Sequence, residues 1–125
     1  MKIQTKRVYE PRDNGDGIRV LVDRIWPRGM TKENLHADLW LKDIAPSDDL
    51  RKWFAHDPSR WSDFKKRYGA ELDEKPQLVQ QLADRAAAGT LTLLFSARDT
   101  ACNQAVALKA YLMAKCKKAG ASGNT

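Results

Sequence analysis

An aspartate and two arginines follow directly on an apolar run near the start of the chain. Residues 19–29 read RVLVDRIWPRG, so Asp23, Arg24 and Arg28 stand where a predicted strand ends and a turn begins. In α/β folds, loops at the carboxyl ends of strands build ligand sites. Guanidiniums supply forked donors that match phosphate and carboxylate oxygens. The spacing therefore predicts a binding site for an anion.

A second polar loop is expected beside the first. Residues 90–95 read TLTLLF, the most strand-like run in the chain, and Ser96, Arg98 and Asp99 follow it. Parallel strands present their carboxyl ends at one edge of a sheet, so this loop and Asp23 are predicted to share a hollow. The arginines would hold the anion. Asp23 and Asp99 are the candidate catalytic carboxylates, which would orient the arginines or act as a base.

The last helix, predicted over residues 100–116, places Cys102 and Asn103 in its first turn. Unpaired backbone N–H groups at a helix amino terminus favour an anion and a thiolate. For Cys102 an inert thiol is the preferred interpretation over a catalytic nucleophile, because the Cys-x5-Arg loop of tyrosine phosphatases would need arginine where Leu108 stands. The candidate ligand-binding residues are Arg24, Trp26, Arg28, Ser96, Arg98, Cys102 and Asn103.

For three further residues, a purely structural role is an alternative to a role in the site. Trp26 lies between two arginines and can stack on a ring of the ligand or cover the sheet edge. His56 can act as a general acid or base in a second shell, although the neighbouring Asp57 is explained by helix capping alone. Asp23 can also pair with an arginine at the sheet edge and bind nothing.

Neither a metal site nor a disulfide is indicated. Two histidines, His36 and His56, and two distant cysteines do not give the close spacing of a structural zinc site. On one helix, Cys102 and Cys116 would lie about 21 Å apart, too far for a disulfide. The sequence identifies no cofactor.

The element pattern predicts a small three-layer α/β domain, with a mostly parallel sheet and helices packed on it. Strands are expected over residues 2–9, 18–22 and 90–95, and a short extended segment over 38–41. Helices are expected at 31–36, from Ser47, after Asp57, and from Pro76 to a left-handed cap at Gly89. Residues 1–116 form the domain, and 117–125 are expected to be a basic, disordered tail.

Composition narrows the function classes. The 125 residues carry 22 Lys and Arg against 16 Asp and Glu, a net charge of +6 that owes much to the carboxyl-terminal lysines. No run approaches the roughly 20 apolar residues of a membrane span, and the polar amino terminus is unlike a signal peptide. A cytoplasmic protein without a membrane partner is expected. The sequence does not predict its oligomeric state.

Several long phrases resemble a known family. The runs KRVYEP, RVLVDRIWPRG, WLKDIAPS, LRKWFAHDPSRW and TLLFSARDTACNQAVAL are similar to the YeaO-like branch of the domain of unknown function 488 family. The resemblance implies a cytoplasmic α/β domain and leaves the reaction open. The family's Asp-x-Arg loop with a following proline corresponds here to Asp23-Arg24 and Pro27. Other branches carry Cys-His-Arg where this chain has Cys102-Asn103-Gln104.

The leading hypothesis is binding of an anionic small molecule, a nucleotide or phosphorylated metabolite, at the carboxyl ends of the strands. If the protein is an enzyme, hydrolysis or group transfer at a phosphate-like centre is expected. The alternative is a nucleic-acid-associated or regulatory module that contacts phosphates through Lys65, Lys66, Arg67 and the lysine tail.

Overall fold

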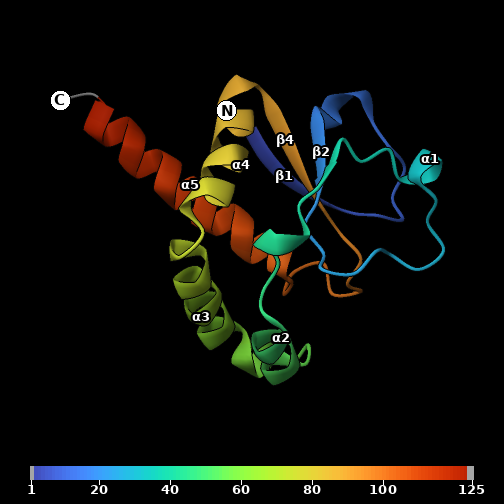
Figure 1. The fold of residues 1–125 in the computed structure, drawn as a ribbon, viewed down its shortest axis with the longest axis horizontal. Coiled ribbons are helices and arrows are strands. Elements are labelled where there is room, and N and C mark those ends of the chain that lie inside the picture. The colour runs from blue at the N-terminus through green and yellow to red at the C-terminus, as the bar shows by residue number, and fades with distance from the viewer. Residues whose placement is uncertain (1, 124–125) are drawn as a thin grey trace.

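Four parallel strands form one sheet in the order β1-β4-β2-β3 (Figure 1). They are β1 (Lys2–Arg7), β2 (Ile18–Leu21), β3 (Leu39–Trp40) and β4 (Thr90–Phe95). This computed structural model describes the backbone of residues 2–123 and the side chains of residues 2–115. The apolar strand β4 lies between β1 and β2, so the two runs that the sequence marks as most strand-like are neighbours.

The helices begin where the sequence predicts a cap in most cases. The Thr31 hydroxyl accepts the Asn34 N–H, and the Ser47 hydroxyl accepts the Leu50 N–H, each at 3.1 Å. Pro76 occupies the first turn of its helix, where a missing N–H costs nothing. The helices are α1 (Lys32–Leu35), α2 (Asp48–Phe54), α3 (Trp61–Asp73), α4 (Pro76–Ala88) and α5 (Gln104–Gly123).

The predicted start of the last helix at residue 100 is wrong. The Asp99 carboxylate accepts the N–H groups of Ala101 and Cys102, at 2.8 and 2.9 Å, and so stabilises a separate turn. The Asn103 side chain then accepts the Val106 N–H at 3.0 Å and caps α5, which begins at Gln104. Cys102 and Asn103 therefore precede the helix. The predicted tail at 117–125 lies outside the residues whose side chains are described.

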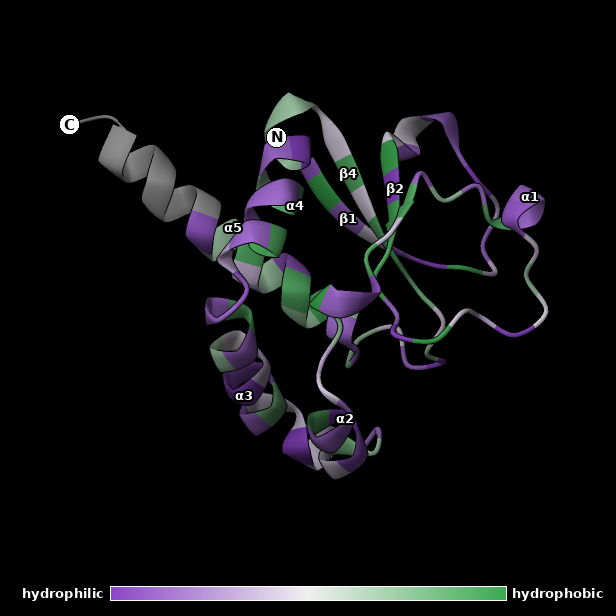
Figure 2. Cartoon of the chain, viewed as in Figure 1, coloured by the Kyte–Doolittle hydropathy of each residue, from purple (hydrophilic) through white to green (hydrophobic). Residues whose placement is uncertain are grey.

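Alternate side chains of the strands enter two apolar clusters. On one face, Leu91, Leu93 and Phe95 pack with residues from α2, α3, α4 and α5 in the larger cluster. On the other face, Leu21 and Leu94 meet α1 and loop residues in a small cluster. Figure 2 shows the apolar residues along the strands and the inner sides of the helices. The expected α/β domain is confirmed, and its layer on the second face consists of one short helix and loops.

A buried ionic cluster joins β1, β2 and the loop between them. Asp16 is 2% exposed and contacts Lys6 at 2.8 Å as well as the guanidinium of Arg19. Its backbone oxygen also accepts the Thr92 hydroxyl of β4 at 2.6 Å. The cluster fixes the loop that leads into β2 and hence the position of the residues that follow that strand.

No helix in the described part of the chain is long and apolar enough to cross a membrane.

Candidate functional site

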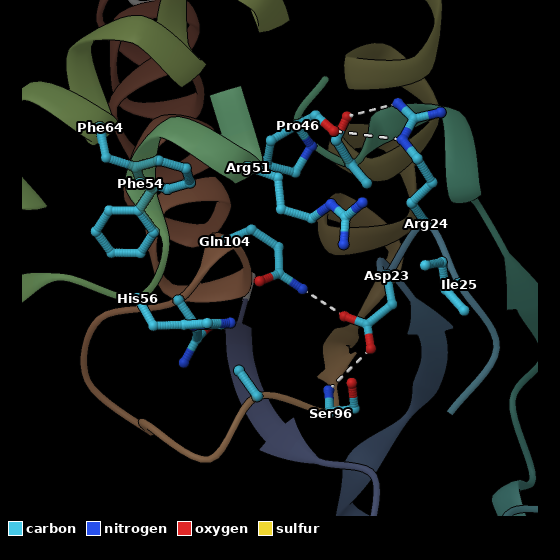
Figure 3. Close-up of a pocket in the computed structure, with 13 residues that line it drawn as sticks. Asp23, Arg24, Ile25, Pro46, Arg51, Phe54, His56, Phe64, Ser96 and Gln104 are labelled. Atoms are coloured by element: carbon cyan, nitrogen blue, oxygen red, sulfur yellow. Dashed lines mark hydrogen bonds between the residues drawn. The ribbon is translucent and has the colours of Figure 1, made fainter. Parts of the chain in front are cut away.

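A cavity of about 220 Å³ opens at the carboxyl ends of β2 and β4 (Figure 3). The loops after these strands line it from one side, α2 and α3 from another, and the start of α5 completes it. Much of its wall is apolar, and these residues are Ile25, Ala45, Pro46, Phe54, Phe64 and Ala97. An apolar wall with a few polar groups is typical of small-molecule sites.

Asp23 joins the three elements that meet at the cavity. The carboxylate accepts the Ser96 N–H at 2.9 Å with one oxygen and the side-chain amide of Gln104 with the other. Burial raises the pKa of Asp23, and the hydrogen bonds from Ser96 and Gln104 oppose this shift without cancelling it. The predicted proximity of the loops after β2 and β4 is thus confirmed by a direct contact.

Arg24 lines the cavity with a partly engaged guanidinium. Its Nε and Nη2 donate long hydrogen bonds to the carbonyl oxygens of Pro46 and Ala45, at 3.4 and 3.3 Å. The carboxylate of Asp48 lies 3.8 Å from Nε. Within the described chain, Nη1 has no hydrogen-bond partner. The N–H groups of Nη1 therefore remain available to donate hydrogen bonds to a ligand.

Arg51 is a second cation of the cavity, and the sequence analysis missed it. It extends from α2, and Figure 3 shows its guanidinium between Gln104 and Arg24. Its Nη2 contacts Asp48 at 3.3 Å, but the side chain is 49% exposed. Nothing in the sequence separates Arg51 from its exposed neighbour Lys52. Only the packing of α2 beside the strand ends selects one of them.

His56 lines the cavity, as its predicted supporting role requires. It follows Ala55, and both residues adopt the left-handed conformation, with φ of 56° and 47°. Such backbone is rare for residues other than glycine and concentrates near functional sites. The turn ends α2 and places the imidazole 6.2 Å from the ring of Phe54.

Four predicted ligand-binding residues do not line the cavity, and three of them, Trp26, Arg28 and Arg98, come from the loops after β2 and β4. Arg28 and Arg98 are exposed on their loops. Trp26 donates its indole N–H to the Met30 carbonyl at 2.7 Å and packs edge-on to Trp40, so it covers the sheet edge. Of the predicted ligand-binding set, the cavity brings together Arg24, Ser96 and Asn103.

Asp99 and Cys102 also lie outside the cavity lining. Asp99 caps the turn before α5, and the donated N–H groups of Cys102 and Ala101 lower its pKa. Burial, together with the carboxylate of Asp99, raises the pKa of the Cys102 thiol. The expectation of a thiolate favoured by a helix amino terminus is therefore wrong, because the helix begins two residues later.

The charges of the cavity are unequal. Two guanidiniums, from Arg24 and Arg51, face one carboxyl group that burial disfavours as an anion. This arrangement suits a small organic anion whose charged end contacts the guanidiniums and whose apolar part contacts Phe54 and Ile25. Among the described residues, no group of three His, Cys, Asp or Glu could hold a metal ion.

Comparisons with known proteins agree with the resemblance in the sequence. A family model described as the inactive DUF488-N3 subclade matches residues 2–125. The uncharacterised protein YeaO of Escherichia coli K12 is 46% identical over 112 residues, which cover 90% of this chain and 97% of that protein. The uncharacterised protein Rv3073c of Mycobacterium tuberculosis is 46% identical over 79 residues, 63% of this chain and 67% of that protein. No solved structure matches.

Proposed function

This chain belongs to the inactive DUF488-N3 subclade, and from this premise we propose that it binds a small organic anion at the carboxyl ends of β2 and β4. One observation carries the proposal. Arg24 from the loop after β2 and Arg51 from α2 converge on one cavity with an apolar wall. The forked N–H groups of guanidiniums match the oxygens of a carboxylate or phosphate group.

The cavity size limits the ligand. Drug-sized ligands occupy pockets of roughly 300–1,000 Å³, whereas this cavity measures about 220 Å³. A complete nucleotide exceeds that space. The proposed ligand is therefore a carboxylate or phosphate monoester with a single ring or a short aliphatic chain.

The proposal is one of binding without catalysis. Asp99, one of the two candidate catalytic carboxylates, caps a backbone turn away from the cavity, and Cys102 is likewise outside its lining. Asp23 lines the cavity, where hydrogen bonds from Ser96 and Gln104 fix the position of its carboxyl group. The description of the subclade as inactive supports the same reading.

Nucleic-acid binding has less support. Arg67 stacks its guanidinium on the ring of Trp53 at 4.2 Å, and Lys65 places its ammonium 5.4 Å from the ring of Trp61. Two of the three basic residues of α3 considered for that role are thus engaged with aromatic rings of their own chain.

Titration with benzoate tests the proposed function. Benzoate and the uncharged benzamide have nearly the same shape, so the difference between their affinities measures the contribution of the negative charge. We expect benzoate to bind the parent protein and benzamide to bind much more weakly, as measured by calorimetry or by NMR shifts. Because the Arg51 side chain is half exposed, Arg51→Ala is expected to weaken benzoate about threefold to tenfold.

Lys52→Ala is the matched control, since Lys52 is an exposed cation on the same helix that does not line the cavity. It should leave the benzoate affinity unchanged. Equal losses in the two variants would mean that benzoate responds only to the general charge of α2. That result, or equal binding of benzamide and benzoate, would refute the proposal.

A further inference from the structure

We propose that the ligand of this cavity is a small apolar amino acid, whose carboxylate contacts Arg51 and Arg24 and whose ammonium group contacts Asp23. The inference rests on the proposed function and names its ligand class. It explains why one small cavity contains groups of both charges, which a site for a simple anion does not need.

The first argument is the position of Asp23 among its neighbours. The residue is 7% exposed, and no described lysine, arginine or histidine lies within salt-bridge distance of its carboxylate. The nearby guanidiniums are directed instead to the carbonyls of Ala45 and Pro46 and to the carboxylate of Asp48. Buried carboxylates are normally paired with a cation. An ammonium group on the ligand supplies this partner.

The second argument is the remaining hydrogen-bonding capacity. The two oxygens of a carboxylate offer about four acceptor positions, and Asp23 accepts the Ser96 N–H, the Ser96 side chain and the Gln104 amide. All of these donors are neutral. The carboxylate can therefore accept a further donor from the cavity, and an ammonium group supplies one with a positive charge.

The third argument is repulsion. A simple anion held by Arg51 would lie in the same small cavity as Asp23, so the bound anion would further oppose ionisation of a carboxyl group that burial already disfavours as an anion. A zwitterion removes this conflict, because its positive end faces Asp23 while its negative end faces the guanidiniums.

The apolar wall receives the side chain. Ile25 is 62% exposed at the rim of the cavity, and Phe54 and Phe64 stack at 4.3 Å inside it. A branched aliphatic side chain would cover Ile25 and contact Phe54. With a volume of about 220 Å³, the cavity favours a free amino acid of the size of leucine over a peptide.

The decisive comparison uses two ligands on the unmodified protein. L-Leucine and 4-methylpentanoate share the carboxylate and the aliphatic chain and differ only in the amine. We expect leucine to bind at least about fivefold more tightly, since a partly buried ion pair contributes that much. NMR titration measures both affinities. If 4-methylpentanoate binds as tightly as leucine or more so, the inference is wrong and the proposed function stands. If neither they nor benzoate bind, the proposed function fails as well.

Asp23→Asn is the matched variant, because it keeps the shape and removes the charge. It should abolish the preference for leucine while binding of 4-methylpentanoate stays equal or improves. Asp43→Asn, an exposed aspartate outside the cavity, should retain the preference. A preference for leucine that survives in Asp23→Asn, with the fold verified by circular dichroism, would overturn the assignment of the ammonium to Asp23.

Discussion

Two buried aspartates show how differently one residue type can be used in this chain. Asp16 and Asp23 are 2% and 7% exposed. Burial alone would raise the pKa of Asp16, but the hydrogen bonds from Lys6, the Asp13 N–H and Arg19 outweigh it and lower the pKa. Asp23 has only neutral donors, so burial prevails and raises its pKa. Asp16 is therefore a structural ion pair, whereas Asp23 has no cationic partner within the described chain.

Replacing each aspartate by asparagine should affect stability in opposite directions. Asp16→Asn breaks a buried ion pair and is expected to cost about 3–5 kcal/mol at pH 7. Asp23→Asn removes a carboxylate whose ionisation the fold opposes. A reversed Gln104 amide can accept from the new side-chain N–H group, so at pH 8 the variant should be neutral or stabilising. Urea unfolding at pH 3 and pH 8 measures both effects.

The direction in which pH changes the stability follows from the direction of each pKa shift. The lowered pKa of Asp16 contributes stability above the ordinary value of 3.8 that is lost as pH falls through the folded value. For Asp23 the raised pKa contributes stability at low pH that is lost as pH rises through the folded value. The penalty of Asp16→Asn should therefore shrink as pH falls below 3.8, and Asp23→Asn should approach the parent near pH 3. A strongly destabilised Asp23→Asn at pH 8, or an unchanged Asp16→Asn, would contradict this account.

At the scale of elements, local sequence signals predict most of what is observed. The caps at Thr31 and Ser47 and the proline at position 76 mark helix starts correctly, and the two most apolar runs are neighbouring strands. The start of α5 is mispredicted because Asp99 and Asn103 are both good caps, and sequence does not decide between them. Arg51 is missed because its role depends on where α2 packs.

Gly17 allows the backbone conformation that precedes β2, and a substitution tests this role. It precedes β2 with φ of 62°, and an added Cβ would lie 2.3 Å from the Thr90 carbonyl oxygen of β4. Gly17→Ala should therefore destabilise the fold by about 2–4 kcal/mol, through backbone strain and overpacking. Thermal or urea unfolding measures the loss.

Gly89→Ala provides the control. The sequence predicts a left-handed cap at Gly89, but its φ is 165°, which is extended backbone, and an added Cβ would meet nothing within 4 Å. Alanine here should change stability little, or raise it slightly by restricting the unfolded chain. A loss at Gly89 as large as at Gly17 would contradict this account of the two glycines.

At the scale of the whole molecule, the cavity lies between the loops after β2 and β4, helices α2 and α3, and the start of α5. Figure 1 shows α2 beside α3, apart from the strands that form the rest of the wall. Asp23 links β2 to the loop after β4 and to α5, while Arg51 comes from α2. A ligand held by both would bridge these parts, and binding to the folded state alone raises its stability by mass action. The family match extends over residues 2–125, so the site is part of a domain that the subclade shares.

The most direct measurement of the central claim is a crystal structure of the protein with 4-bromobenzoate, located by the anomalous signal of bromine. The account predicts a bromine peak beside Phe54 and Ile25, with the carboxylate within hydrogen-bond distance of Arg51 or Arg24. A cavity without ligand at saturating concentration, or a peak only in the groove beside Trp53 and Arg67, would contradict it.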